Sequence, residues 1–184
     1  MDSFVIIVAS AKNGVIGRGT EIPWDYPSDL SFFRNQTADM PVIMGRKTYN
    51  SIYEKLGHPL ENRYNIVLSS IRSNVSGVEF DNVVHCESKT EAIRRANEYM
   101  ASVDGGEIYV AGGVTVYEQF LPDASKIIRT EIPERPSGDV FFPKIPPEYK
   151  VEDEFVIGDG LIVEVYENVA NNSSTPETLS TDKN

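Results

Sequence analysis

Four short apolar runs restrict the fold of this chain more than any other feature of its sequence. They are rich in Val and Ile and do not alternate with polar residues: FVIIVA (4–9), PVIMG (41–45), NIVLSS (65–70) and EIYVAGG (107–113). A strand with one face in water alternates between apolar and polar residues, whereas a strand covered on both faces does not. The four runs therefore predict buried strands of a mostly parallel sheet.

Helical patterns separate and follow these runs. Residues 88–100 begin with the capping box SKTE and repeat apolar residues at helical spacing, and residues 114–121 place apolar residues on one side of a helix after a Gly-Gly pair. Near the C-terminus, residues 151–157 and 161–167 flank the turn sequence GDG and predict an antiparallel hairpin. The predicted fold class is a three-layer α/β domain with a central mixed, mostly parallel sheet flanked by helices.

The length of the chain, 184 residues, predicts one domain, which we place at residues 1–167. Residues 168–184 are polar and lack periodicity, so they are expected to form a disordered tail. The run FVIIVA is too short to cross a bilayer, and Asp2 stands where a signal peptide carries positive charge. The single cysteine, Cys86, excludes an internal disulfide and fits a reducing compartment. A soluble, cytoplasmic protein is expected.

The net charge of −11 argues against a nucleic-acid or anionic-membrane partner, because both bind basic surfaces. The negative charge is concentrated in residues 131–167, which hold ten acidic and three basic residues. An anionic ligand is therefore expected to bind elsewhere, beside a local cluster of Arg and Lys. We expect a small-molecule ligand and a monomer.

Asp29 lies in an apolar environment at the start of a predicted helix. It shares a helical face with Phe32 and Phe33, three and four residues later. One interpretation is a solvated carboxylate in the first helical turn, where the macrodipole favours negative charge. However, the apolar neighbours, including Ile22 and Trp24, leave little polar surface. A lone buried carboxylate is costly unless a cation or hydrogen-bond donor meets it, or it protonates. The pattern therefore indicates a ligand with N–H donors, or a proton-transfer role.

Two strand-to-helix turns are candidate anion sites. The sequence GRKT (45–48) places two cations at a helix start, where backbone N–H groups attract phosphate. Gly112 and Gly113 also precede a helix and would let the backbone approach a pyrophosphate, although the full G-x-G-x-x-G fingerprint is absent. The alternative for both is an ordinary strand–helix turn.

Arg63 stands two residues before the run 65–70. It is either a surface arginine or a bidentate clamp for a carboxylate, to which the planar guanidinium is better suited than an ammonium group. His58 and His85 have no partners at metal-ligand spacing, so no metal site is predicted.

The order of these motifs along the chain resembles that of the dihydrofolate reductases, from about Phe4 to Glu167. The matching stretches are GVIGRGTEIPW, PSDLSFFR, PVIMGRKTYNSI, NRYNIVLSS, AGGVTVYEQFLP and GDVFFP. Several motifs in family order are far more specific than any one of them. The resemblance implies NADPH-dependent reduction of 7,8-dihydrofolate to tetrahydrofolate, with hydride transfer to C6 and protonation at N5.

The resemblance also assigns roles toward the substrate. Asp29 matches the buried carboxylate that binds the N3 proton and 2-amino group of the pterin, and burial should raise its pKa. A water near the pterin, rather than Asp29 itself, is the expected proton donor to N5. Thr130 matches the threonine that hydrogen-bonds this carboxylate, and Arg63 matches the arginine that pairs with the glutamate α-carboxylate. Trp24 orders water beside the substrate, and Ile22 belongs to the mobile loop over the nicotinamide. The other implied substrate contacts are Ile7, Val8, Ala9, Leu30, Phe33, Ile52 and Ala111.

For the cofactor NADPH, the resemblance implies a phosphate-binding set in which Arg46 and Ser70 are the candidates for the 2′-phosphate. The Gly112–Gly113 peptide bond is expected to be cis. Ile16 and Gly17 belong to the mobile loop, which is expected to exclude water from the nicotinamide. The full implied cofactor set is Ala9, Ile16, Gly17, Gly45, Arg46, Lys47, Thr48, Leu68, Ser69, Ser70, Gly112, Gly113, Val114, Thr115, Val116 and Tyr117.

Three positions depart from the family pattern. Ala111 replaces a bulky aliphatic residue, so the pocket should be roomier beside the aminobenzoyl group. Thr115 replaces a basic residue seen in some relatives, which puts one phosphate contact in doubt. The segment 53–62 is longer than in many relatives.

Two alternatives stay open at this stage. A sister class with the same fold reduces a ribosylaminopyrimidine in riboflavin synthesis, but it would need no glutamate-binding arginine. A non-catalytic dinucleotide-binding protein on the same scaffold would be expected to lose the loop and the carboxylate, yet both are present.

Overall fold

The structure, a computed structural model, describes residues 3–170. Eight strands form the main sheet: β1 (Phe4–Ala11), β3 (Pro41–Gly45), β4 (Tyr64–Leu68), β5 (Val83–Cys86), β6 (Ile108–Val110), β7 (Ala124–Ile132), β9 (Tyr149–Val156) and β10 (Ile162–Asn168). The helices are α1 (Pro27–Thr37), α2 (Arg46–Leu56), α3 (Lys89–Met100) and α4 (Val114–Phe120). A separate two-stranded sheet joins β2 (Val15–Gly17) to β8 (Val140–Phe141). Short 3-10 turns occupy Arg72–Asn74, Leu121–Asp123 and Gly158–Gly160.

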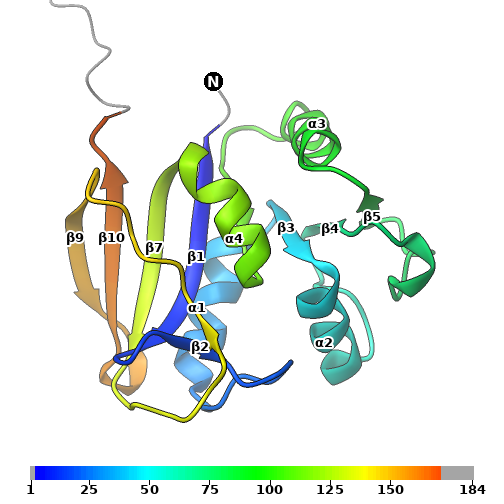
Figure 1. Cartoon of the computed structure of the whole chain (residues 1–184). Helices are drawn as coiled ribbons and strands as arrows, with labels where there is room; N and C mark the ends of the chain where they lie inside the picture. The colour runs from blue at the N-terminus through cyan, green and yellow to red at the C-terminus, as the bar shows by residue number, and fades with distance from the viewer. Residues whose placement is uncertain (1–2, 171–184) are drawn as a thin grey trace, which may run out of the picture.

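The strand order of the main sheet is β5-β4-β3-β6-β1-β7-β10-β9 (Figure 1). The pairs from β5 through β7 are parallel, and β10 pairs antiparallel with β7 and β9. The predicted fold class is therefore confirmed, including the C-terminal hairpin. All four predicted strands are present. The sequence did not predict β5 or β7, because β5 has only four residues and charged residues interrupt the apolar pattern of β7.

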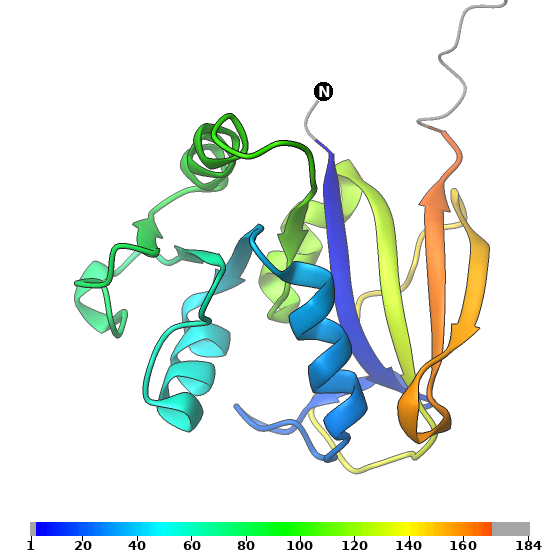
Figure 2. The same ribbon diagram turned by 180° about the vertical axis from the view of Figure 1, so that it is seen from behind.

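Helices cover both faces of the sheet. In Figure 2, α1 lies in front of the sheet and α4 lies behind it. The packing places α2 on the same face as α1, and α3 on the same face as α4. The buried side chains form a cluster on each side: one joins the sheet to Ala92 and Ala96 of α3 and to Phe120 of α4, and the other joins it to Tyr49 of α2. Burial on both faces explains why the strands carry unbroken apolar runs.

Helix α1 packs only in part against the core. Phe32 and Phe33 are only partly buried against the sheet, and Leu30 is 57% exposed. Leu30, Phe32 and Phe33 also line a cavity, so the apolar face of this helix is shared between the core and the cavity. The sequence pattern gives the apolar face but cannot distinguish a core from a cavity wall.

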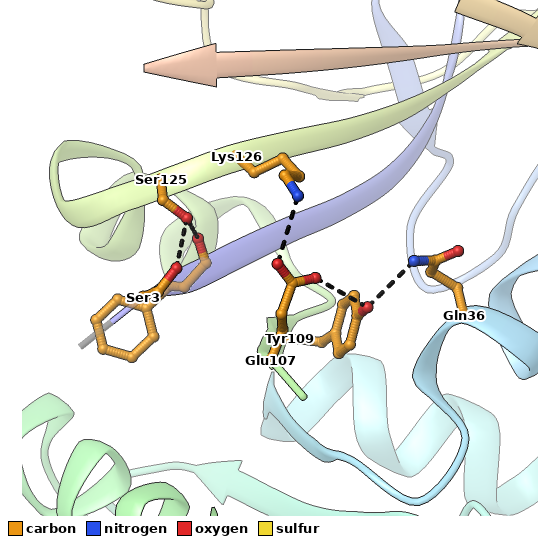
Figure 3. Close-up of polar contacts among 7 residues, drawn as sticks. Ser3, Gln36, Glu107, Tyr109, Ser125 and Lys126 are labelled. Carbon is orange, nitrogen blue, oxygen red and sulfur yellow. Dashed lines mark hydrogen bonds and ion pairs between the residues drawn. The ribbon is translucent and has the colours of Figure 1, made fainter. Parts of the chain in front are cut away.

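Polar contacts anchor the C-terminal half of α1 to the sheet (Figure 3). Gln36 Nε2 donates a 3.2 Å hydrogen bond to the Tyr109 hydroxyl, which in turn donates to Glu107 Oε2 at 3.3 Å. Glu107 also pairs with Lys126 Nζ at 3.4 Å. This network links α1 to β6 and β7, and so holds the helix at a fixed distance from the strands that carry the site.

Strand β10 includes Asn168, one residue beyond the predicted end of the domain, and Asn168 is buried. The disorder predicted for the tail lies outside the described residues from position 171 onward. None of the helices described is long and apolar enough to cross a membrane.

Candidate active site

A cavity of about 1090 Å³ opens over the carboxyl ends of the parallel strands. Ligands of open α/β sheets bind at this edge, because the strand-to-helix turns gather there. Every residue that the sequence predicted to bind substrate or cofactor, and every predicted catalytic residue, lines this one cavity. The prediction that they form a single site is therefore consistent with the geometry, while the individual roles stay predictions.

Asp29 faces this cavity from the first turn of α1. Burial raises the pKa of its carboxyl, and a hydrogen bond from the Thr130 side chain partly opposes that rise. Thr130 is buried on β7, beside its register partner Ala9 on β1. The start of α1 is fixed by Ser28, whose hydroxyl donates to Asp159 Oδ2 at 2.5 Å in the β9–β10 turn. The carboxylate is thus held between a helix start and two strands.

Tyr117 closes the cavity floor beside Asp29. Its hydroxyl donates a 2.8 Å hydrogen bond to the Ile7 carbonyl oxygen in the buried interior. Burial and, secondarily, the charge of Asp29 raise the pKa of this phenol. Tyr117 is therefore neutral, and the Asp29 charge has no cationic partner among the described residues of the cavity floor.

Arg63 lies in the same cavity and is only 8% exposed. Its guanidinium donates one long hydrogen bond of 3.5 Å to the Arg34 carbonyl oxygen, and its buried Nε has no hydrogen-bond partner within residues 3–170. Burial and the neighbouring Arg34 lower the pKa of Arg63. A buried cation with unsatisfied donors is costly without an anion, so the geometry favours the carboxylate-clamp interpretation over a surface arginine.

Two turns at the other end of the cavity bring backbone close to backbone. The Gly45 N–H donates a 2.7 Å hydrogen bond to the Gly112 carbonyl oxygen, and the Gly112–Gly113 bond is cis, as the resemblance implies. A Cβ on Gly45 would approach Val116 to 3.2 Å, and one on Gly113 would approach Thr48 Oγ1 to 3.2 Å. Glycine at both positions keeps this cradle open.

The cradle has the chemistry of an anion site. No side chain caps the N-terminus of α2, whose first residues are the cations Arg46 and Lys47. Neither cation has an ion-pair partner among the residues that the structure describes. Free N–H groups and two unpaired cations fit the phosphates of a dinucleotide.

The segment from Ile16 to Ile22 forms one side of the cavity mouth. It is tied to β8 by the β2 pairing and by a 2.8 Å hydrogen bond from the Gly19 N–H to Asp139 Oδ1. On the other side, the Ser51 hydroxyl of α2 donates to the Thr20 carbonyl oxygen at 3.0 Å. These contacts hold the segment, called the lid below, across the cavity.

The cavity wall also contains residues that the sequence analysis missed. They lie on the lid, on α1, on and just after α2, after β5, on α4 and in β8: Gly19, Thr20, Glu21, Phe32, Arg34, Ser51, Lys55, Leu56, Leu60, Glu87, Gln119 and Val140. Helical spacing could have found Ser51 and Lys55, which follow Thr48 on α2 by three and seven residues. No local signal marks Glu87, because the strand before it was not predicted.

Comparison with known proteins decides the family. The sequence model of the family described as dihydrofolate reductase matches residues 3–158. The chain belongs to the dihydrofolate reductase family. It is 38% identical over 165 residues to dihydrofolate reductase HdrB of Haloferax volcanii, covering 89% of this chain and 82% of that protein. It is 38% identical over 155 residues to dihydrofolate reductase of Haemophilus influenzae, covering 83% and 88%.

A solved structure of dihydrofolate reductase from Enterococcus faecalis, complexed with NADP(H) and RAB-propyl, has a TM-score of 0.74 and 28% identity to this chain. The match covers 90% of this chain and 95% of that one. As a dihydrofolate reductase, the protein is an oxidoreductase that uses NADPH to reduce 7,8-dihydrofolate to tetrahydrofolate, the step that supplies one-carbon metabolism. The prediction of this function from sequence is confirmed.

Proposed function

We propose that Asp29 and Arg63 hold the two ends of dihydrofolate in this dihydrofolate reductase. The observation that carries the proposal is that a half-buried carboxylate and a buried, poorly satisfied guanidinium face one cavity. Dihydrofolate offers N–H donors at its pterin and a carboxylate at its glutamate, so each protein group meets the partner that it lacks. The riboflavin-synthesis alternative has no use for Arg63, and the dinucleotide-binding alternative has none for Asp29.

Asp29 binds the N3–H and 2-amino group of the pterin. Because burial disfavours the charged carboxylate in the free enzyme, two N–H donors from the substrate stabilise it when the pterin enters. The Thr130 side chain hydrogen-bonds the carboxylate, and we assign to it a second hydrogen bond, to a pterin-linked water. The negative charge polarises the ring so that N5 becomes more basic.

Protonation of N5 is assigned to a water admitted beside the pterin, ordered by Trp24 at the cavity wall. The hydride goes to C6, and NADPH supplies it when bound. Phe33 and Ile52 flank the pterin and aminobenzoyl groups, while Ile7, Val8 and Ala9 form the strand beneath the ring. The lid covers the reacting atoms and excludes bulk water, which strengthens the electrostatic effect of Asp29.

The cofactor phosphates are assigned to the glycine cradle and the start of α2. Arg46 and Lys47 supply positive charge, Thr48 and Ser70 supply hydroxyls, and the Gly112–Gly113 turn allows close approach of the pyrophosphate. Arg46 and Ser70 are assigned to the 2′-phosphate. The residues present therefore fit a phosphorylated dinucleotide.

The proposal includes the setting of the enzyme. One catalytic domain, predicted at residues 1–167 and extended by Asn168 of β10, acts as a monomer in the cytoplasm, on a small-molecule substrate and without a nucleic-acid or membrane partner. The support is the net charge of −11 and the single cysteine, Cys86, which is buried.

A direct test follows the loss of NADPH absorbance with dihydrofolate as substrate. The wild-type chain should turn over, and Asp29→Asn should bind NADPH while losing most of its rate at neutral pH. NADPH binding without any wild-type turnover would contradict the proposal and favour a non-catalytic role.

A further inference from the structure

Glu87 extends the cofactor end of the cavity beyond the predicted residues. It follows β5 directly, and β5 pairs in parallel with β4, with Cys86 as the register partner of Leu68. The Ser69 N–H donates a 2.9 Å hydrogen bond to the Cys86 carbonyl oxygen. Glu87 therefore leaves the sheet at the same edge as Ser69 and Ser70, and all three residues line the cavity.

The carboxylate of Glu87 has no hydrogen-bond or ion-pair partner anywhere in residues 3–170. Only its backbone is engaged, because its N–H donates a 3.0 Å hydrogen bond to Glu91 Oε2. This contact differs from the predicted capping box: the Ser88 side chain accepts from the Glu91 N–H as expected, but the Glu91 carboxylate reaches Glu87 instead of Ser88. The cap fixes the backbone and leaves the Glu87 side chain exposed at the cavity.

The cavity wall contains both cations and carboxylates. The wall contains five cations, Arg34, Arg46, Lys47, Lys55 and Arg63, and three carboxylates, Glu21, Asp29 and Glu87. Of the carboxylates, Glu87 is the one beside the serines that end β4. At the facing helix start, α4 presents the neutral Thr115, and Gln119 one turn later is also neutral. Among the residues that line this end of the cavity, positive charge is therefore limited to the start of α2.

An acidic side chain at the adenosine end of a dinucleotide site discriminates between a free ribose 2′-hydroxyl and a 2′-phosphate. A carboxylate accepts a hydrogen bond from a free ribose 2′-hydroxyl and repels a 2′-phosphate, whereas Arg favours the phosphate. This cavity combines both features. Arg46 and Ser70 favour the 2′-phosphate, while Glu87 opposes it and Thr115 adds no charge to offset that repulsion.

We propose that Glu87 is a specificity-determining residue that narrows the binding preference of this enzyme for NADPH over NADH. The inference rests on the proposed placement of the 2′-phosphate near Arg46 and Ser70. The proposal applies only to the cofactor end of the cavity. The roles proposed for the substrate-binding residues stay the same.

Binding of NADPH and NADH to the wild-type protein, Glu87→Gln and Glu118→Gln tests this inference. Trp24 is the single tryptophan and lines the cavity, so quenching of its fluorescence reports both dissociation constants. Glu118→Gln removes the same charge from an exposed position on α4 that does not line the cavity. We expect Glu87→Gln to raise the ratio of the NADH to the NADPH dissociation constant by about fivefold to tenfold, and Glu118→Gln to leave it unchanged.

Salt provides a second measurement, because the effect of an exposed charge is screened. The difference between the wild-type protein and Glu87→Gln should shrink as ionic strength rises. An unchanged ratio in Glu87→Gln, or an equal change in Glu118→Gln, would overturn the inference. Because the readout is binding, it stays informative even if the wild-type protein failed to reduce dihydrofolate, which would instead contradict the proposed function.

Discussion

The Thr130 side chain is hydrogen-bonded to the carboxylate of Asp29 across the boundary between β7 and α1. The bond opposes the rise in pKa that burial imposes on Asp29, so it keeps more of the carboxylate ionised than burial alone would allow. Two elements far apart in the sequence therefore set the charge state of one group, and the behaviour of Asp29 variants follows from that balance.

Asp29→Asn should lower the rate of hydride transfer at neutral pH by about 100-fold or more, because the amide cannot hold the pterin donors or polarise the ring. The NADPH dissociation constant should not change. Single-turnover kinetics with saturating NADPH measure the first quantity, and fluorescence titration measures the second. A rate equal to wild type would remove Asp29 from its role.

The same variant should be more stable than the wild-type protein without ligand. Because the pKa of Asp29 is raised above its ordinary 3.8, the folded state holds this proton to higher pH than the unfolded chain. The contribution of the protonated Asp29 carboxyl to the free energy of unfolding is fully present below the unfolded-state pKa. It is lost as pH rises through the folded-state pKa. The stability difference between Asp29→Asn and wild type should therefore grow from acidic to neutral pH in urea unfolding, and a constant difference would contradict this.

Arg63→Lys should raise the KM for dihydrofolate by about 10-fold to 100-fold, because an ammonium cannot form the bidentate pair with the glutamate carboxylate. Steady-state kinetics with varied dihydrofolate measure this change. A reduced pterin that lacks the glutamate is the matched control, and both proteins should use it equally. If the variant loses the same activity on that control, the guanidinium acts on something other than the carboxylate.

Asp139→Ala should slow hydride transfer by about threefold to tenfold, because it removes the hydrogen bond that holds Gly19 of the lid, a bond worth about 1 kcal/mol. Ser51→Ala removes the contact on the opposite side, to Thr20, and should act in the same direction. Stopped-flow measurement of hydride transfer tests both. Wild-type rates in the two variants would show that these contacts do not hold the lid in the reactive arrangement.

Tyr109→Phe should lower the free energy of unfolding by about 1–2 kcal/mol, because it leaves Gln36 and Glu107 without the hydroxyl that joins them (Figure 3). Tyr109 does not line the active-site cavity, so the NADPH dissociation constant should stay the same. Urea unfolding gives the first value. An unchanged midpoint would show that the network does not stabilise α1 against the sheet.

Ala111→Ile should strengthen the binding of aromatic antifolates by about 1–3 kcal/mol, because it restores a large aliphatic contact beside the aminobenzoyl region. Ala111 lines the cavity and is only partly buried against the core, so the larger side chain has space. Inhibition constants measure the gain. Weaker inhibition of the variant, with cofactor binding unchanged, would mean that other side chains already fill the space beside Ala111.

Much of the fold could be predicted because its signals are local. Burial on both faces requires the unbroken apolar runs of β1, β3, β4 and β6. The turn sequence between β9 and β10 predicts a hairpin. Strand β7 escaped prediction because Lys126 and Arg129 interrupt its pattern, and both find acidic partners only in the folded protein.

The candidate active site could also be predicted only in part. Most of the cavity-lining residues could be predicted from the sequence, because an acid among aromatic residues, paired cations at a helix start and a Gly-Gly turn each have a chemical reason. The folded structure was needed to show that Asp139 and Ser51 hydrogen-bond the lid, and that Glu87 joins the cofactor end of the cavity. Those outcomes depend on strand order and register, which bring distant residues together and which no local pattern encodes.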